Sequence, residues 1–123
     1  MDQNVRIYAM LCHLLSLTLY LGLPLGNILG PLVIWLILRD RDPSINQHGK
    51  ESLNFQITFM IYMLVLSAVG FVVGVLTCGL GFIPLGLLLG VLGIVQIVLV
   101  IQASVEAYNG RPYAYPMTIR FIL

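Results

Sequence analysis

The few residues that could form a functional site are polar side chains within long apolar stretches. At helical spacing, Glu51, Asn54 and Thr58 share one face, and Gln56 lies off it. In a bilayer such groups are costly unless they are paired. They therefore indicate either a functional site or a set of internal hydrogen bonds.

A second polar group lies near the end of the last apolar stretch. Gln102 and Glu106 are one helical turn apart, and Gln96 lies deeper. Two interpretations follow: these residues line a polar crevice near the inner leaflet together with the first group, or they form interhelical hydrogen bonds and interface-level contacts. The second interpretation is favoured. Glu51 also suits a helix N-terminus, where the helix dipole stabilises an anion.

The two histidines are too far apart in sequence to predict a site. His13 lies deep in the first apolar stretch, where a lone imidazole can act as a proton relay or a ligand. No carboxylate or second histidine is near it in sequence, which favours a hydrogen-bonded structural role. His48 lies in a charged stretch beside Lys50 and Glu51.

No motif predicts catalysis. Cys12 and Cys78 have neither disulfide-framework nor metal-ligand spacing, and we expect two buried structural thiols. The sequence lacks a nucleophile elbow, a zinc-protease signature, a P-loop and a dinucleotide fingerprint. We therefore expect no catalytic residues, metal or cofactor, and predict that the protein is not an enzyme. A net charge of +1 argues against nucleic acid as a partner.

Composition predicts the elements that position these residues. The chain is 59% hydrophobic and 9% charged, with a mean hydropathy of +1.00. A soluble domain carries roughly 25% charged residues. The sequence therefore predicts an all-α integral membrane protein whose surroundings are the lipid bilayer.

Charges divide the chain into two uncharged blocks, residues 7–38 and 52–105. Because a span takes about 20 residues, the second block holds two spans. The first holds either a short pair of helices or one kinked helix, and the break at Gly22–Asn27 favours the pair. We expect one transmembrane domain over residues 1–123, with helices over 4–21, 26–40, 52–77 and 83–107, a cytoplasmic loop over 41–51 and an interfacial tail over 108–123.

The basic residues predict the orientation. All six lie near the N-terminus, in the central charged stretch or in the tail. Four spans as two helical hairpins, with both termini cytoplasmic, put every one of them on the inner side, as the positive-inside rule requires.

Glycines recur at four-residue spacing, which places them on one helix face and lets backbones approach closely in lipid. Such faces serve either dimerisation or packing inside one monomer, and packing is favoured here. The predicted packing positions are Gly22, Gly26, Gly30, Gly70, Gly74, Gly86 and Gly90.

Three stretches carry a resemblance to a known family. They are His48–Gln56 (HGKESLNFQ), Leu23–Leu32 followed by Trp35, and Tyr115–Phe121. Together they resemble a family of small bacterial and archaeal membrane proteins of unknown function. That family is similar to the channel subunit of the plastid Tic import complex and contains the magnetosome proteins MamF and MmsF. The resemblance covers nearly the whole chain.

The resemblance implies four transmembrane helices in the inner membrane of a prokaryote, and it provides no catalytic residues to carry over. Two functions remain open. One is a non-enzymatic scaffold or accessory subunit that binds other membrane components. The other, implied by the plastid relative, is a component of a transport or protein-translocation channel, which requires a homo-oligomer or a larger membrane complex.

Overall fold

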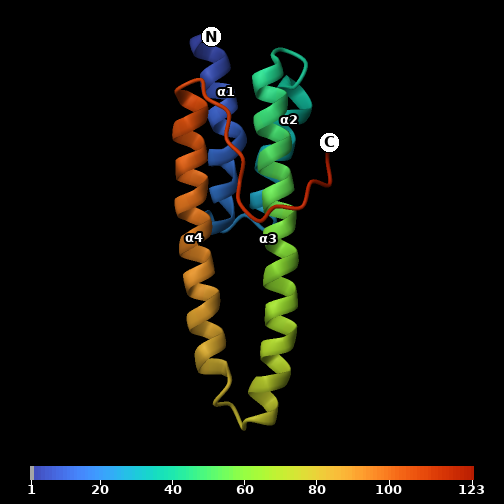
Figure 1. The fold of residues 1–123 in the computed structure, drawn as a ribbon, viewed down its shortest axis with the longest axis vertical. Coiled ribbons are helices and arrows are strands. Elements are labelled where there is room, and N and C mark those ends of the chain that lie inside the picture. Colours follow the sequence, from blue (N-terminus) through green and yellow to red (C-terminus); the bar gives the residue numbers. More distant parts are fainter. Residues whose placement is uncertain (1) are drawn as a thin grey trace.

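The computed structural model describes residues 2–123, and the helices account for most of them (Figure 1). No strand occurs in this range, so the all-α prediction is confirmed. The elements, in chain order, are α1 (Gln3–Leu14), the 3-10 helix η1 (Leu15–Leu21), α2 (Gly26–Leu38), α3 (Pro43–Leu76) and α4 (Phe82–Tyr108).

Three helical stretches are long and apolar enough to cross a membrane: Gln3–Leu21, Pro43–Leu76 and Phe82–Tyr108. Their mean hydropathies are 1.2, 2.5 and 2.6 over the best window. α2 has 13 residues, about 20 Å of helix against a hydrocarbon core of about 30 Å. The protein is thus a membrane protein by its helices, while the four-span count and the cytoplasmic side of the termini stay predictions.

α3 begins nine residues earlier than expected, because residues 43–51 are helical rather than a loop. The Asp42 side chain accepts a hydrogen bond from the Ser44 backbone N–H at 2.8 Å, and Pro43 occupies the first turn. An aspartate followed by proline is a strong helix start. Charge alone suggested a loop, but this part of α3 carries its charges on a helix.

The two halves of the molecule, along its length, contain different numbers of helices. α3 and α4 lie side by side and are joined by a turn in which Cys78 and Gly79 have positive φ. α1, η1 and α2 pack only against the half that contains both termini (Figure 1). There Gln3 Nε2 donates to the Tyr108 hydroxyl at 2.7 Å, which ties the start of α1 to the end of α4.

Glycines allow close contact at several of the predicted positions. A Cβ on Gly30 would lie 2.5 Å from the Leu15 carbonyl oxygen, and one on Gly26 would lie 2.9 Å from the Leu19 nitrogen. On α3, the space beside Gly70 is filled by a leucine of α4, Leu85. The backbone of α2 therefore lies directly against η1.

The remaining predicted glycines contact different surroundings. Gly74 meets the Phe82 ring. A Cβ on Gly86 or Gly90 would meet nothing within 4 Å among residues 2–123, so these two do not pack inside the monomer. Gly22 is also open and serves the turn after η1, where its φ is +97°.

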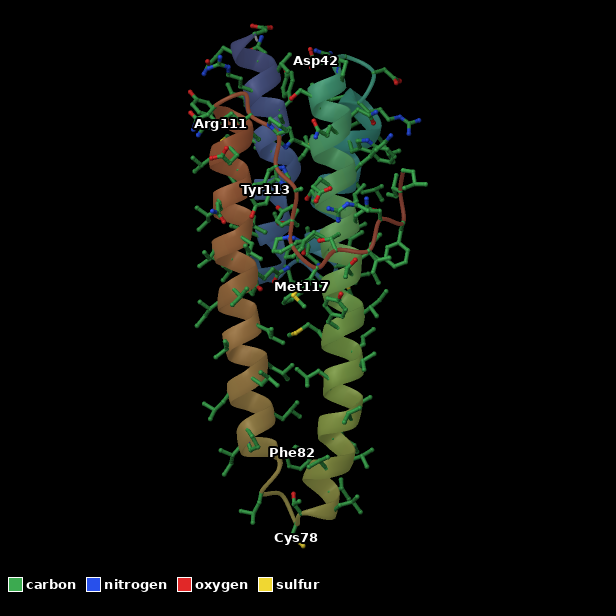
Figure 2. The ribbon with its side chains drawn as sticks, viewed as in Figure 1. Asp42, Cys78, Phe82, Arg111, Tyr113 and Met117 are labelled. Carbon is green, nitrogen blue, oxygen red and sulfur yellow. The ribbon has the colours of Figure 1, made fainter. Side chains whose placement is uncertain are left out.

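The two cysteines differ, contrary to the expectation that both are buried. Cys12 is fully buried, and its thiol lies 3.9 Å from the Ile45 carbonyl oxygen. Cys78 is exposed, because it forms the turn between α3 and α4 with a φ of +56°. Figure 2 shows it at the end of the molecule opposite Arg111.

Alanine substitutions should separate the packed glycines from the open ones. Gly30→Ala forces a methyl group onto the Leu15 carbonyl and should destabilise the fold by about 1–3 kcal/mol. Gly86→Ala gains helix propensity in open space and should stabilise it by about 0.5–1 kcal/mol. Denaturation in detergent micelles measures both; equal effects would contradict the packing described above.

Candidate functional site

A buried polar cluster joins α1, α3 and the tail. His13 of α1 and His48 of α3 are hydrogen bonded, with 2.8 Å between Nε2 of the first and Nδ1 of the second. His13 Nδ1 is 2.8 Å from the Tyr115 hydroxyl in the tail. All three residues are buried. We call them the histidine cluster.

The neighbours of the two histidines determine which atoms donate and which accept in the hydrogen bonds of the cluster. We assign the ring proton of His48 to Nε2, which faces the backbone of Arg111. Since His48 Nδ1 is then unprotonated, it accepts from His13 Nε2–H, and His13 Nδ1 accepts from the Tyr115 O–H. With both rings neutral, each of their nitrogens has a partner.

The tail forms a strap over α3, defined here as residues 111–123. Asn54 clamps it by donating to the Ile122 carbonyl at 2.9 Å and accepting from the Ile122 N–H at 2.8 Å. Thr58 accepts from the Ile119 N–H at 3.0 Å, and the Tyr62 hydroxyl donates to the Met117 carbonyl at 2.9 Å. Figure 2 shows the strap descending from Arg111 through Tyr113 to Met117 beside the bundle.

Charged groups fasten the strap at a higher level. Glu51 accepts from the Tyr115 backbone N–H at 2.6 Å and forms an ion pair with Arg120 at 3.1 Å. Lys50 Nζ donates to the Leu123 carbonyl at 2.9 Å. The face that Glu51, Asn54 and Thr58 share is thus used to bind extended backbone, one residue per helical turn.

Electrostatics keep the strap phenols protonated. Burial raises the pKa of Tyr115 well above its usual value, and the nearby Tyr113 and Glu51 raise it further. The pKa of Tyr113 is raised by burial and then by Glu106 and Glu51. Tyr115 therefore remains a hydrogen-bond donor to His13 over the physiological range.

Four amide and phenol side chains form a second cluster below the first. Gln96 Nε2 donates to Gln56 Oε1 at 2.5 Å, and the Tyr20 hydroxyl donates to Gln96 Oε1. Asn27 donates to Gln56 over a longer distance, 3.4 Å. This amide cluster connects η1, α2, α3 and α4. Two of its buried atoms, Asn27 Oδ1 and Gln56 Nε2, have no hydrogen-bond partner.

The alternative interpretation, in which both polar groups line one crevice, does not describe the structure. Gln102 and Glu106 lie on the outer part of α4, where Gln102 accepts from Tyr113 at 3.3 Å and Glu106 pairs with Arg111 at 2.7 Å. The side-chain hydrogen bond to Glu106, with its charge, raises the pKa of Arg111. Gln56 and Gln96 belong to the amide cluster instead.

Sequence reasoning missed the histidine pair, because 35 residues separate its members. It also missed Tyr115, because residues 108–123 were predicted as an interfacial tail. Gly49 offered a signal, since a Cβ there would overlap the Trp35 ring, and His48 directly precedes it. A glycine that requires close approach of α2 and α3 implies that its neighbours are buried as well.

Metal-binding clusters are not found over residues 2–123, where no three histidine, cysteine, aspartate or glutamate side chains come together. The histidine cluster has two imidazoles whose nitrogens are engaged with each other, Tyr115 and Arg111. Its chemistry is therefore that of a closed hydrogen-bonded chain.

Comparison with known proteins identifies the family. Residues 4–122 match the family described as the magnetosome magnetite crystal formation protein family. The chain belongs to this family. No curated protein and no solved structure matches the chain, and the similarity to the plastid Tic channel stays a prediction.

The match to the magnetosome magnetite crystal formation family covers the histidine cluster, the amide cluster and the strap as far as Ile122. The domain that defines the family is therefore the whole helical unit rather than one helix. Family membership and the apolar helices together indicate an accessory role at a membrane.

Removing the Tyr115 hydroxyl tests the histidine cluster. Tyr115→Phe keeps the stacked contact with Phe55, whose ring centroid is 4.0 Å away, but leaves His13 Nδ1 without its donor. An unpaired buried acceptor costs about 1–3 kcal/mol. Unfolding in detergent should show this loss. The matched control Tyr113→Phe, at a partly exposed site, should cost clearly less, and equal losses would count against the cluster.

The raised pKa of Tyr115 also predicts a pH dependence. The pKa of Tyr115 is higher in the folded protein than in the unfolded chain, so folding favours the neutral phenol over the phenolate. The contribution of Tyr115 is complete below about pH 10 and is lost as the pH rises beyond it. The stability difference between wild type and Tyr115→Phe should narrow above about pH 10; a constant difference up to pH 12 would contradict it.

Proposed function

We propose that this protein is a non-enzymatic accessory protein of the membrane in which magnetite crystals form, and that it acts as a helical scaffold for other membrane components. The observation that carries the proposal is that the polar side chains of the histidine cluster and those that hold the strap are paired within the chain. The histidine cluster is closed, and Asn54 is paired twice with Ile122. These groups stabilise the fold, and few of their hydrogen-bonding atoms remain free to bind a substrate.

A groove between the two long helices supports the same function. It has a volume of about 550 Å³ and lies between α3 and α4 below η1. Apolar side chains such as Met60, Met63 and Ile94 form most of its wall, and Tyr20, Asn27 and Gln96 lie at its polar end. A wall of this kind suits lipid chains better than ions or polypeptide backbone.

We assign the binding of partner proteins to the end of the molecule that contains both termini and the exposed charged residues. Arg39 and Arg41 are exposed there, and each guanidinium lies over an aromatic ring, Trp35 and Tyr8 respectively. Under the positive-inside rule this end faces the cytoplasm. Partner proteins would then meet a rigid cytoplasmic face held by the strap and the first turns of α3.

A channel remains the second candidate function, and one observation favours it. Asn27 Oδ1 and Gln56 Nε2 are unpaired at the centre of the bundle, where a rearranged oligomer would use them to line a path. A single copy has too few helices to enclose a pore, so this function requires several copies or a partner.

Complementation tests the scaffold. In a magnetite-forming host that lacks its own family member, the full chain should restore crystal formation, scored by electron microscopy, and a recurrent set of membrane proteins should co-purify with it. Arg39→Ala with Arg41→Ala should weaken co-purification while the membrane level of the protein stays the same. Failure to restore crystals with a folded, membrane-inserted protein would overturn the proposal.

Flux through liposomes tests the alternative. Vesicles with the purified protein should stay tight to ions and small polar dyes if it is a scaffold. A channel should leak, and Asn27→Leu with Gln56→Leu should abolish the leak because both unpaired groups are gone. Leakage that depends on these two residues would replace the scaffold by the channel.

A further inference from the structure

The N-terminal unit, defined as α1, η1 and α2, ends halfway along α4. Tyr20 donates to Gln96, and its hydroxyl would lie 3.8 Å from a Cβ on Gly93. About 16 Å of α4 lies between Phe82 and Gly93. At its other end the unit is level with the end of α4, where Gln3 bonds to Tyr108. The N-terminal unit therefore stops about 16 Å short of the turn that contains Cys78.

The ion pair between Glu51 and Arg120 lies above the hydrocarbon core, because charged side chains are costly inside it. Glu51 is the last charged residue of α3, and no charge follows until Glu106. Below this pair, residues 57–76 of α3 form about 30 Å of apolar helix, which equals the core thickness. The bilayer midplane then lies about 15 Å above Leu76, close to the level where the N-terminal unit ends.

We propose that the N-terminal unit inserts into one leaflet only, and that the protein therefore favours bilayers that are convex on its charged side. The partner is the phospholipid leaflet itself. The tip of the unit is apolar, and Leu21 is 86% exposed there. On its outer face Val33 and Ile37 are 52% and 69% exposed. Such side chains require lipid around them.

The cross-section of the protein differs between the leaflets. The half of the molecule with the termini contains α1, η1, α2, α3 and α4, and the other half contains α3 and α4 alone (Figures 1 and 2). Packed helices do not compress, so the extra volume spreads the lipids of one leaflet. The amide cluster holds the unit in place through Gln56 and Gln96. Insertion of apolar helices into one leaflet is sensitive to curvature.

The orientation gives the curvature a direction. With the basic end in the cytoplasm, the favoured membrane is convex towards the cytoplasm, as in an invagination or an internal vesicle. This inference depends on the depth of the N-terminal unit and holds whether or not the scaffold function is correct.

Spin-label depth measurements test the one-leaflet insertion. A nitroxide at Leu21→Cys, in a Cys78→Ser background, should be accessible to oxygen and protected from a water-soluble nickel reagent. Cys12 is fully buried and stays unlabelled. A label on the native Cys78 provides the comparison at the far membrane surface. Equal access of the nickel reagent to both positions would mean that the N-terminal unit crosses the bilayer, and would overturn the proposal.

Vesicles of mixed diameter test the curvature preference. Full-length protein labelled at Cys78 is reconstituted into phosphatidylcholine–phosphatidylglycerol vesicles, and its density is measured vesicle by vesicle. The density should be about threefold higher in the smallest vesicles than in the largest. A parallel sample is reconstituted without the label. In its smallest vesicles an impermeant thiol reagent should fail to reach Cys78, because the narrow half faces the lumen.

Two matched variants add bulk to opposite halves at the same helical spacing. Val69→Phe with Val73→Phe widens the narrow half at exposed sites and should reduce the preference. Val33→Phe with Ile37→Phe widens the other half at exposed sites and should increase it. A density independent of diameter, or equal responses of the two variants, would overturn the proposal.

Discussion

Buried polar groups must be satisfied by the protein itself, and this constraint accounts for most of the tertiary structure. α1 lies against α3 where His13 meets His48. The tail covers α3 because Asn54, Thr58 and Tyr62 pair with its backbone. Hydrophobic burial distinguishes little between one helix face and another in lipid, so hydrogen bonds and small residues select the packing.

The distribution of these polar groups also divides the molecule mechanically. Both clusters and the strap lie in the half that contains the termini. In the other half, α3 and α4 are joined by contacts such as Gly70 with Leu85 and Gly74 with Phe82. The groove of about 550 Å³ opens where the amide cluster ends. We infer that the half with the termini is the more rigid of the two, because side-chain hydrogen bonds cross-link it.

Sequence patterns predicted the features that depend on local chemistry. The uncharged blocks predicted the long helices, and the predicted bounds 52–77 and 83–107 left a short turn between them, where the structure has it. The start of α3 was predicted nine residues late, although Asp42 and Pro43 form a local helix start. The charges of this segment indicated a loop, but a helix that extends beyond the bilayer carries charge without penalty.

The clusters could not be predicted in the same way, because each joins residues far apart in the chain. His13 and Tyr115 are 102 residues apart, and Tyr20 and Gln96 are 76 apart. Polarity inside an apolar stretch indicated that partners must exist, but many pairings satisfy that requirement. For Gly86 and Gly90 the same four-residue spacing as in Gly26 and Gly30 gave open space instead of contact.

The strap has a consequence for the order in which the protein assembles. Tyr115 and Ile122 are translated only after α4, so His13 and Asn54 enter the membrane before their partners have been synthesised. Until then their polar groups need water, lipid headgroups or the insertion machinery. The newly made bundle therefore matures in a late step, in which the C-terminal segment folds back and seals it.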